Sequence, residues 1–368
     1  MDFPNREIME LEVDLGGIFL HNGTYDYDTD YTYEDELESR GAAAVLIPLL
    51  FSIVLAFGVL GHTLVMVFLG LKRQSWSISD IFVLHLGLTD VILLITQPFW
   101  AAQTALRLGW CCGVFWCRIN GALFNISFYC GMLQLLCIAG ERYLNIIRSV
   151  QLFTQKKPWL THIVCLVIWL VSILLSIPDW VSMLYIQEKN MDGENLCSCF
   201  ANIYRSKWQI PARVIHHVTF LLPVILLTIF FYYILKQIQD SAKACERLRS
   251  MKLILVLALV FFLCWTPYNI SLIIDTWKSR SKTYVPGKMT LLATLALACV
   301  HACLRPLIYF GLCEKFREKT LAAAKCGLED LNGDLWDLGV GSENMPDQSS
   351  NPEEMKQINS MGQQSDKV

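Results

Sequence analysis

Charge is scarce in this chain. Asp, Glu, Lys and Arg make up 17% of its 368 residues, where soluble domains typically have about 25%. Most of these charges lie in the terminal segments and in short breaks between seven long apolar runs. A soluble fold cannot cover so much apolar sequence with polar surface. The composition therefore excludes a soluble globular protein and indicates a membrane protein.

Catalytic signatures are also missing. The sequence holds no phosphate-binding loop, no metal-ligand cluster and no nucleophile elbow. His216 and His217 are adjacent, so they point to different faces of a helix and do not form a metal pair. We therefore expect no enzyme, no cofactor, no metal site and no nucleic-acid partner.

The seven apolar runs each exceed the roughly 20 residues that a helix needs to cross a bilayer. Runs of this length are helices, because helices satisfy their own backbone hydrogen bonds in lipid. The sequence predicts an all-α membrane protein with a seven-helix bundle over 41–312 and a short amphipathic membrane-surface helix over 313–326. Residues 327–368 are acidic and predicted to be disordered. The runs are 42–71, 78–106, 113–140, 159–186, 209–236, 250–277 and 286–312.

Basic residues in the breaks predict the orientation. Lys and Arg gather after the first, third, fifth and seventh runs, and the positive-inside rule places these breaks in the cytoplasm. A basic stretch over 278–288 falls on the other side, but four clusters outweigh one. The N-terminus is then extracellular. Residues 1–40 lack a signal-peptide core, so we expect the first run to direct insertion.

The N-terminal segment 1–40 holds twelve acidic and two basic residues, so we expect it to be disordered. It is either a solvated spacer or an acidic surface that attracts a basic protein ligand. The second interpretation assigns ligand contacts to an alternating aromatic and acidic stretch. The residues concerned are Tyr25, Tyr27, Asp28, Asp30, Tyr31 and Tyr33. The sequon at Asn22 predicts N-glycosylation.

The third run ends in Glu141-Arg142-Tyr143. An arginine at a membrane helix centre costs about 2.5–3.5 kcal/mol, and less near the interface. Its presence therefore indicates a function, and an acid-arginine-tyrosine lock is typical of a two-state transducer. In the sixth run, Trp265 precedes Pro267, where a missing N–H gives the helix a hinge. The alternative for Trp265 is simple packing.

Two further charges lie inside apolar runs: Asp90 in the second, and Arg305 in the seventh, one residue before Pro306. An ionisable residue inside a membrane is a functional-site hypothesis by default. At ~4 Å and an effective dielectric constant of ~20, the two charges attract by about 4 kcal/mol, which desolvation partly offsets. We predict an Asp90–Arg305 ion pair. The alternative is that Arg305 extends to the lipid interface.

Aromatic and acidic residues recur in the outer halves of the second, third, fourth and sixth runs. Each alone is as compatible with packing as with binding, but together they indicate an outward-facing pocket for a basic peptide end. They are Trp100, Tyr129, Asp179, Tyr268 and Asp275.

None of the fourteen cysteines precedes Cys111. Five lie on the predicted outer side: Cys111, Cys112, Cys117, Cys197 and Cys199. We predict a Cys117–Cys197 disulfide that ties the third run to the second outer loop, and leave the others open. At the inner end, Cys313 and Cys326 are either palmitoylated or plain thiols.

These motifs resemble the rhodopsin-like (class A) G-protein-coupled receptors, and within them the chemokine receptors. Three segments carry the likeness: Glu141-Arg142-Tyr143, Cys264-Trp265-Thr266-Pro267-Tyr268 and Thr96-Gln97-Pro98. Residues 121–126, Gly-Ala-Leu-Phe-Asn-Ile, resemble the C-X-C type 3 receptors most. The resemblance implies a plasma-membrane receptor that binds a basic C-X-C chemokine. It also implies an inhibitory-class G protein and arrestin as cytoplasmic partners.

Several positions depart from the family pattern. The family's Asn-Pro-x-x-Tyr begins here with Arg305 and ends at Tyr309, and its Gly-Asn in helix one is followed here by His62 instead of Asn. A polar residue expected eleven positions before the lock arginine is Gly131. Asp90, the family's sodium ligand, has thus lost partner oxygens and gained a cation. We hypothesise that the Arg305 guanidinium takes the role of the sodium ion.

These departures favour a scavenging receptor that internalises chemokine with little G-protein coupling. The alternative is a fully signalling receptor that couples to an inhibitory G protein. A third interpretation is a transporter with Asp90 and Arg305 as a relay. The internal repeats and interrupted helix pairs typical of transporters are absent from the sequence.

Overall fold

The computed structural model of the chain describes a set of ranges that together cover the apolar runs and their flanks. They are 29–72, 76–106, 113–148, 150, 152–153, 158–189, 195–201, 209–239, 244–278, 288–324 and 335–336. The chain divides into two compact units, Met1–Ala42 and Ala43–Val368. The second unit contains the packed helices.

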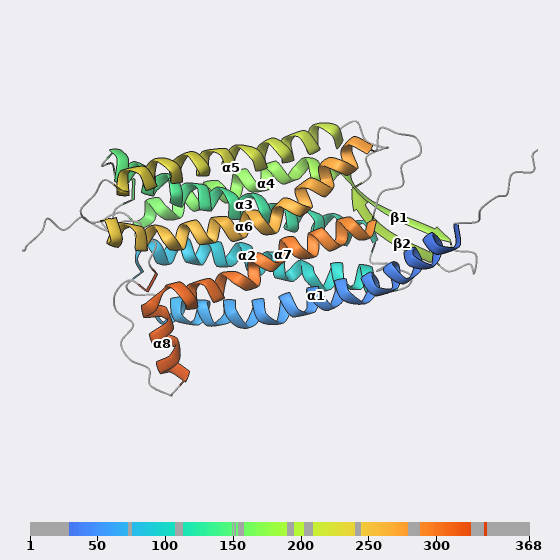
Figure 1. The fold of residues 1–368 in the computed structure, drawn as a ribbon, viewed down its shortest axis with the longest axis horizontal. Coiled ribbons are helices and arrows are strands. Elements are labelled where there is room, and N and C mark those ends of the chain that lie inside the picture. Colours follow the sequence, from blue (N-terminus) through green and yellow to red (C-terminus); the bar gives the residue numbers. More distant parts are fainter. Residues whose placement is uncertain are drawn as a thin grey trace, which may run out of the picture. The chain divides into compact units, whose positions relative to one another are not determined.

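Eight helices and one hairpin form the described part of the chain (Figure 1). The helices are α1 (Thr29–Leu71), α2 (Ile78–Ala105), α3 (Gly113–Arg148), α4 (Pro158–Ser182), α5 (Gln209–Gln239), α6 (Ala244–Lys278), α7 (Lys288–Leu312) and α8 (Glu314–Ala324). The strands β1 (Met183–Lys189) and β2 (Asn195–Ala201) pair antiparallel between α4 and α5. Seven of the helices are long and apolar enough to cross a membrane. The predicted seven-helix membrane bundle with a short eighth helix is confirmed, and the hairpin is an addition that the apolar runs do not signal.

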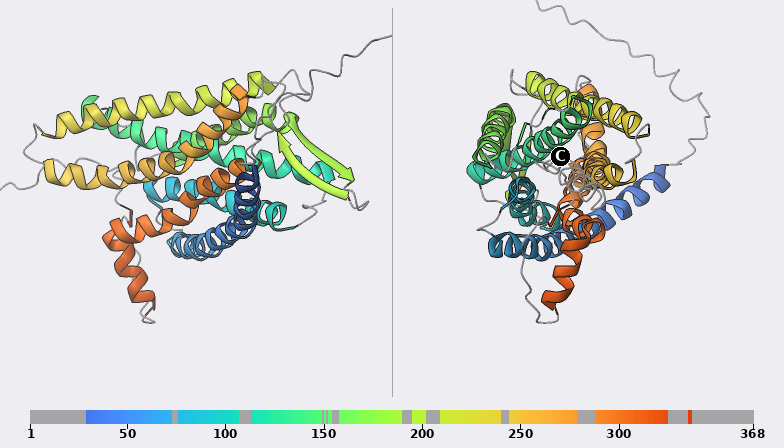
Figure 2. Two further views of the ribbon diagram at one scale, coloured as in Figure 1. Left: turned by 45° about the vertical axis from the view of Figure 1, so that its right-hand side comes forward. Right: turned by 90° about the vertical axis from the view of Figure 1, so that its left-hand side faces the viewer.

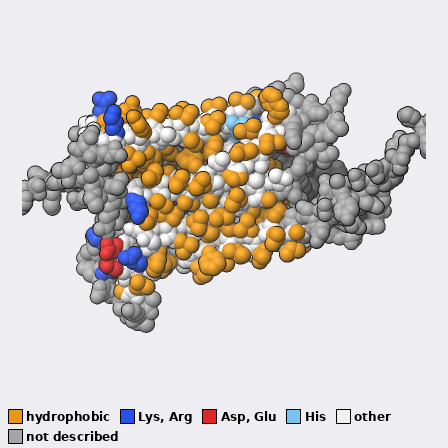
Figure 3. Space-filling model, viewed as in Figure 1, with side chains coloured by type: hydrophobic (Ala, Val, Ile, Leu, Met, Phe, Trp, Pro, Cys, Tyr) orange, Lys and Arg blue, Asp and Glu red, His pale blue; other side chains and the backbone are white. Residues whose placement is uncertain are grey.

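The bundle has two distinct ends, which we name the hairpin end and the α8 end. The β1–β2 hairpin lies at one end, and α8 turns away from α7 at the other (Figures 1 and 2). Helix α3 packs against α2, α4, α5 and α6 and also contacts the hairpin, so it holds the bundle together along its length. Large apolar side chains such as Leu60, Phe115 and Leu263 are exposed. Figure 3 shows hydrophobic side chains spread over the face of the bundle between the two ends. Such a surface suits lipid, not water.

Some predicted boundaries differ from the structure. Helix α1 begins at Thr29, so residues 29–40 are helical and not disordered as predicted. Acidic residues are favourable near a helix N-terminus, where they interact with the helix dipole, and this stretch is rich in them. Helix α3 continues to Arg148, beyond the apolar run that ends at 140, because hydropathy marks lipid burial and not the end of a helix.

The predicted disorder of 327–368 is also wrong at one point. Leu335 and Trp336 are both buried against the bundle. The prediction of disorder depends on a segment's overall shortage of apolar residues and on its net charge. Composition averaged over an acidic tail therefore does not detect two apolar residues within it. The remaining residues of that segment lie outside the described part of the chain.

Gly61 of α1 packs tightly against Pro306 of α7. A Cβ atom added at Gly61 would lie 2.7 Å from Cβ of Pro306, whose rigid ring cannot turn aside. Gly61→Ala should therefore lower the stability of the purified protein by about 1–3 kcal/mol, the usual cost of overpacking. The matched control is Gly70→Ala in the same helix, where an added Cβ meets nothing within 4 Å. Equal thermal unfolding midpoints for the two variants in detergent would contradict this close approach.

Candidate functional site

A buried ion pair lies in the middle of the bundle. Nη1 of Arg305 in α7 is 2.7 Å from Oδ2 of Asp90 in α2. The same nitrogen donates a hydrogen bond of 2.9 Å to the carbonyl oxygen of Leu86. Asp90 is 1% exposed and Arg305 is 2% exposed. The predicted pair is therefore present, and the alternative that Arg305 extends to the lipid interface is wrong.

Two imidazoles complete the surroundings of Asp90. Nε2 of His62 in α1 lies 3.3 Å from Asp90 Oδ2 and 2.9 Å from the carbonyl oxygen of Ala302. Both neighbours are acceptors, so this nitrogen carries the hydrogen. Nε2 of His301 lies 3.5 Å from Asp90 Oδ1, while its Nδ1 is 2.6 Å from the carbonyl oxygen of Ala298. The two carboxylate oxygens of Asp90 thus face nitrogen groups from α1 and α7.

His301 was not predicted from the sequence, although a signal existed. It precedes Arg305 by four residues, which places the two on one face of α7. Gly131 was predicted as part of the site, but it has no side-chain oxygen to contribute. A Cβ added at Gly131 would face the Phe261 ring at 3.3 Å and Thr89 Oγ1 at 3.9 Å. A hard cation needs oxygen ligands, and here the acid is satisfied by nitrogen groups instead.

Trp265 lies between this cluster and the hairpin end. It is fully buried in α6, two residues before Pro267. Its ring is 4.6 Å from Phe128 and 5.0 Å from Phe124, centroid to centroid, and 5.8 Å from His301. Through His301 the aromatic contacts continue to Asp90. A displacement of Trp265 would therefore act directly on a group that faces the Asp90 carboxylate.

The predicted pocket residues are connected at the hairpin end. The ring of Phe124 contacts the rings of Trp100 and Tyr268, with centroid distances of 6.5 and 5.3 Å. The hydroxyl group of Tyr129 is 3.1 Å from Nδ1 of His216 in α5. The Tyr268 ring contacts the same imidazole at 6.4 Å. Residues from α2, α3, α5 and α6 thus form one aromatic network.

Arg213 is a cation in this network that was not predicted from the sequence. Its Nη2 is 3.7 Å from Oδ2 of Asp275, and it also attracts Asp179, which lies beside Tyr129. Arg213 is buried. An internal arginine therefore lies near the acids expected to contact a basic ligand and offsets part of their negative charge. Its position near the start of α5, outside any motif, gave no signal.

The predicted lock residues lie toward the α8 end. Glu141 and Arg142 are adjacent and both buried in α3. The ring of Tyr143 stacks on Phe230 of α5, with centroids 4.9 Å apart. Tyr309 is buried at the same end of α7. The structure thus places the acid, the arginine and the tyrosine at the end of the bundle that carries α8.

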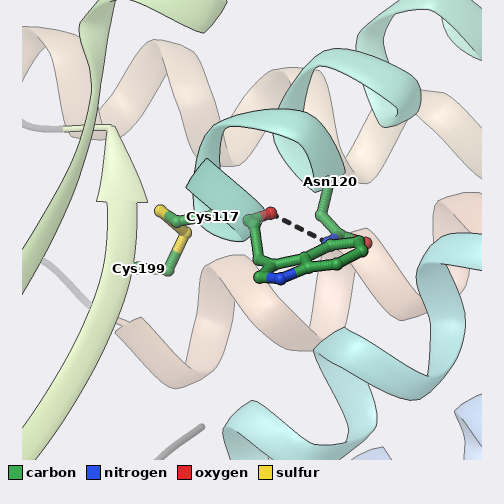
Figure 4. Close-up of a disulfide and its surroundings, with 4 residues drawn as sticks. Cys117, Asn120 and Cys199 are labelled. Carbon is green, nitrogen blue, oxygen red and sulfur yellow. Dashed lines mark hydrogen bonds between the residues drawn. A yellow bond between two sulfur atoms is a disulfide. The ribbon is translucent and has the colours of Figure 1, made fainter. Parts of the chain in front are cut away.

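The disulfide joins Cys117 to Cys199, not to Cys197 as predicted (Figure 4). The Cα atoms of the pair are 5.6 Å apart. Cys197 and Cys199 are two residues apart in β2, so their side chains share a face and the pattern cannot separate them. The register decides, because it places Cys199 opposite Tyr185, near the start of the hairpin, and Cys197 opposite Gln187.

Other predicted residues are only partly covered by the structure. Asn22, Tyr25, Tyr27, Asp28 and Cys326 lie outside the described residues. The backbone of Asp30, Tyr31 and Tyr33 belongs to α1. Cys313, between α7 and α8, is completely buried. That burial leaves no surface for an acyl chain and so does not favour palmitoylation at Cys313.

Seven membrane helices around a buried charge cluster, with an acid-arginine-tyrosine lock at the α8 end, define a seven-helix membrane receptor. Residues 61–309 match the family model of the 7 transmembrane receptor (rhodopsin family). The C-X-C chemokine receptor type 3 of Bos taurus is 31% identical over 85% of this chain and 87% of its own length. The human C-X-C chemokine receptor type 5 is 31% identical over 74% of this chain and 75% of its own length. The C-X-C chemokine receptor type 2 of Pan troglodytes is 30% identical over 78% of this chain and 80% of its own length.

The chain therefore belongs to the rhodopsin family of seven-transmembrane receptors, and within it to the C-X-C chemokine receptors. These proteins are receptors and not enzymes. Membership of this family also removes the support for the transporter interpretation.

Proposed function

We propose that this receptor lies in the plasma membrane with the hairpin end outside the cell and the α8 end in the cytoplasm. Two observations support this orientation. The Cys117–Cys199 disulfide is at the hairpin end, and disulfides persist on the oxidising, extracellular side of the membrane. The breaks after the first, third, fifth and seventh runs are rich in Lys and Arg. The acidic N-terminal segment is then extracellular.

The ligand of this receptor is a basic C-X-C chemokine. The acidic segment attracts the body of the chemokine, and the network at the hairpin end receives its N-terminal part. Arg213 and Asp275 are 3.7 Å apart, beyond hydrogen-bond distance. A basic group of the ligand can therefore replace Arg213 beside Asp275. Arg213 would then move, and the aromatic network leads from there to Trp265.

The receptor acts mainly by capturing and internalising chemokine, with reduced G-protein coupling. The observation that carries this proposal is the buried Asp90–Arg305 pair. It ties α7 to α2 directly, because Nη1 of Arg305 donates hydrogen bonds to two groups of α2, the Asp90 carboxylate and the Leu86 carbonyl. A rearrangement of α7 has to break this pair inside the protein, where an unpaired charge is costly. Such a tie opposes switching.

Full signalling through an inhibitory-class G protein, with arrestin as a further partner, is the second possible function. The observation that favours it is the buried Glu141-Arg142-Tyr143 segment at the α8 end. This segment keeps the acid, the arginine and the tyrosine of the family's lock. The two functions share the ligand and differ only in the cell's response once the chemokine is bound.

A binding experiment with a coupling measurement on the same cells tests the proposal. Cells that express the receptor are exposed to a panel of labelled C-X-C chemokines, and surface binding, uptake and cyclic AMP are measured. We expect saturable binding and uptake of at least one chemokine, without a pertussis-toxin-sensitive fall in cyclic AMP. No binding across the panel would refute the ligand class. A robust toxin-sensitive response would refute reduced coupling.

Neutralising acids in the N-terminal segment should slow chemokine association. For Asp28→Asn combined with Asp30→Asn, we expect an association rate roughly threefold lower at low salt, because long-range attraction is lost. The difference should shrink as salt shortens the Debye length. The matched control neutralises Glu353 and Glu354 in the C-terminal tail, on the other side of the membrane. Equal association rates for all three proteins would show that the acidic segment is only a spacer.

A further inference from the structure

Two residues of the C-terminal tail are seated in the α8 end of the bundle. Trp336 is fully buried, and Leu335 beside it is nearly so. The indole Nε1 of Trp336 donates a hydrogen bond of 2.7 Å to Oδ1 of Asp80. In Figure 1 this tail segment, coloured dark red, lies at the same end of the bundle as α8. A buried indole needs a partner for its N–H group, and Asp80 provides one.

Asp80 belongs to a rigid corner between α1 and α2. Its Oδ2 accepts hydrogen bonds from the backbone nitrogen and the hydroxyl group of Ser77, at 2.6 and 2.7 Å. Nζ of Lys72 binds the same oxygen at 2.6 Å. Ser77 in turn caps α2, so the carboxylate is fixed by the helix start. The other carboxylate oxygen of Asp80, Oδ1, accepts the hydrogen bond from Trp336.

Two rings on α7 and α8 form the other wall of this Trp336 pocket. The indole lies 4.8 Å from Phe316 and 5.3 Å from Tyr309, centroid to centroid. Phe316 also packs on Phe68 of α1 at 5.5 Å. Tyr309 is four residues after Arg305, on the helix that carries the central ion pair. Trp336 therefore bridges the start of α2 to the end of α7 and the first turn of α8.

We propose that Trp336 is an intramolecular plug: the receptor's own tail binds the pocket formed by Asp80, Tyr309 and Phe316 and locks α7 and α8 against α2. An outward movement of the α7 end has to break the indole–carboxylate hydrogen bond and separate the Trp336 ring from Tyr309 and Phe316. Release of the tail then precedes any binding of a cytoplasmic partner. This inference uses the proposed orientation, but it depends neither on the identity of the chemokine nor on reduced coupling.

The first test measures whether the pocket holds Trp336 in solution. The full-length receptor in nanodiscs is exposed to hydroxyl radicals, and oxidation at Trp336 is followed by mass spectrometry. We expect oxidation about fivefold slower than at the same residue after unfolding in dodecyl sulfate, because a docked residue reacts only when the site opens. Phe316→Leu, which removes one wall of the pocket, should raise the rate in the folded receptor. Equal rates in folded and unfolded protein would overturn the plug.

The second test measures which helices the plug holds. Trp336→Ala should accelerate backbone hydrogen–deuterium exchange at 309–318 and at the start of α2 by about fivefold. Trp336→Phe keeps an aromatic ring in the pocket but loses the N–H donor, so it should fall between Trp336→Ala and wild type. The matched control is Trp159→Ala in α4, where the side chain is 57% exposed. If Trp336→Ala behaves like Trp159→Ala, the bridge between α2 and α7 is refuted.

The third test addresses the cytoplasmic partner. Ligand-stimulated nucleotide exchange on a purified inhibitory-class G protein is measured for Trp336→Ala in the native and Arg305→Asn backgrounds. In the Arg305→Asn background, where the central ion pair no longer opposes switching, we expect about a fivefold gain. No gain there, with deuterium exchange accelerated, would overturn the gating role of the plug. A gain already in the native background would support the plug and contradict the Asp90–Arg305 pair as the cause of reduced coupling, so the two proposals fail separately.

Discussion

Arg305→Asn should make the receptor sensitive to sodium and increase its G-protein coupling several-fold. In the native receptor the Arg305 guanidinium lies 2.7 Å from Asp90 and supplies the positive charge at this site. The substitution removes that charge and leaves a carboxylate in the core beside an amide oxygen. A carboxylate and an amide are oxygen ligands of the kind that a hard cation prefers. A sodium ion can then bind and leave, which a tethered guanidinium cannot do.

The size of the effect depends on the burial of the pair. Removing one partner of a buried ion pair typically costs about 3–5 kcal/mol, because the remaining charge is uncompensated. In potassium buffer, Arg305→Asn should therefore unfold at a clearly lower temperature than the native receptor. In sodium buffer part of the loss should return, by about 2.7 kcal/mol when sodium exceeds its dissociation constant a hundredfold. The native receptor should show no difference between the two buffers.

The matched control is Arg305→Leu, which removes the same charge but offers no oxygen to sodium. It should lose stability in both buffers and show no recovery. Coupling is measured for the three proteins by nucleotide exchange on an inhibitory-class G protein with saturating chemokine. If Arg305→Asn gains neither sodium sensitivity nor coupling, the Arg305 guanidinium does not act in place of sodium.

Cys199→Ser should abolish chemokine binding at the cell surface, whereas Cys197→Ser should leave it nearly intact. The Cys117–Cys199 bond closes a segment with a sequence separation of 82 residues. Closing a loop of that length stabilises a fold by about 4–5 kcal/mol in the chain-entropy model. The bond also holds β2 to the start of α3, beside the network proposed to receive the ligand. Its loss therefore affects both stability and binding.

Surface display by flow cytometry and binding of labelled chemokine separate these two effects. Cys117→Ser should match Cys199→Ser, and the double substitution should be no worse than either, because both remove the same bond. Cys197→Ser is the internal control, since it changes the same strand on the same face. Loss of binding in Cys197→Ser with retention in Cys199→Ser would show that Cys117 pairs with Cys197 instead.

The sequence predicted the helices and the central pair because each depends on a strong local rule. A helix that crosses a bilayer needs an apolar run of about 20 residues, and a carboxylate buried in the bundle needs a charge partner to offset its desolvation. His301 and Arg213 were missed because their contacts depend on how neighbouring helices are rotated against one another, which apolar runs do not report. The choice between Cys197 and Cys199 depended on strand register. Trp336 was missed because it lies in a tail of acidic composition and no local pattern marks its partner Asp80.

The ion pair in the core also constrains how this receptor can evolve. If Asp90 were lost first, Arg305 would keep only the Leu86 carbonyl among its partners in α2, and sodium, being a cation, could not neutralise it. If Arg305 were lost first, dissolved sodium could replace it at once. A return to the family's usual motif is therefore tolerated only if position 305 changes before position 90. Among natural descendants of this sequence, exchanges at position 305 should precede any at position 90.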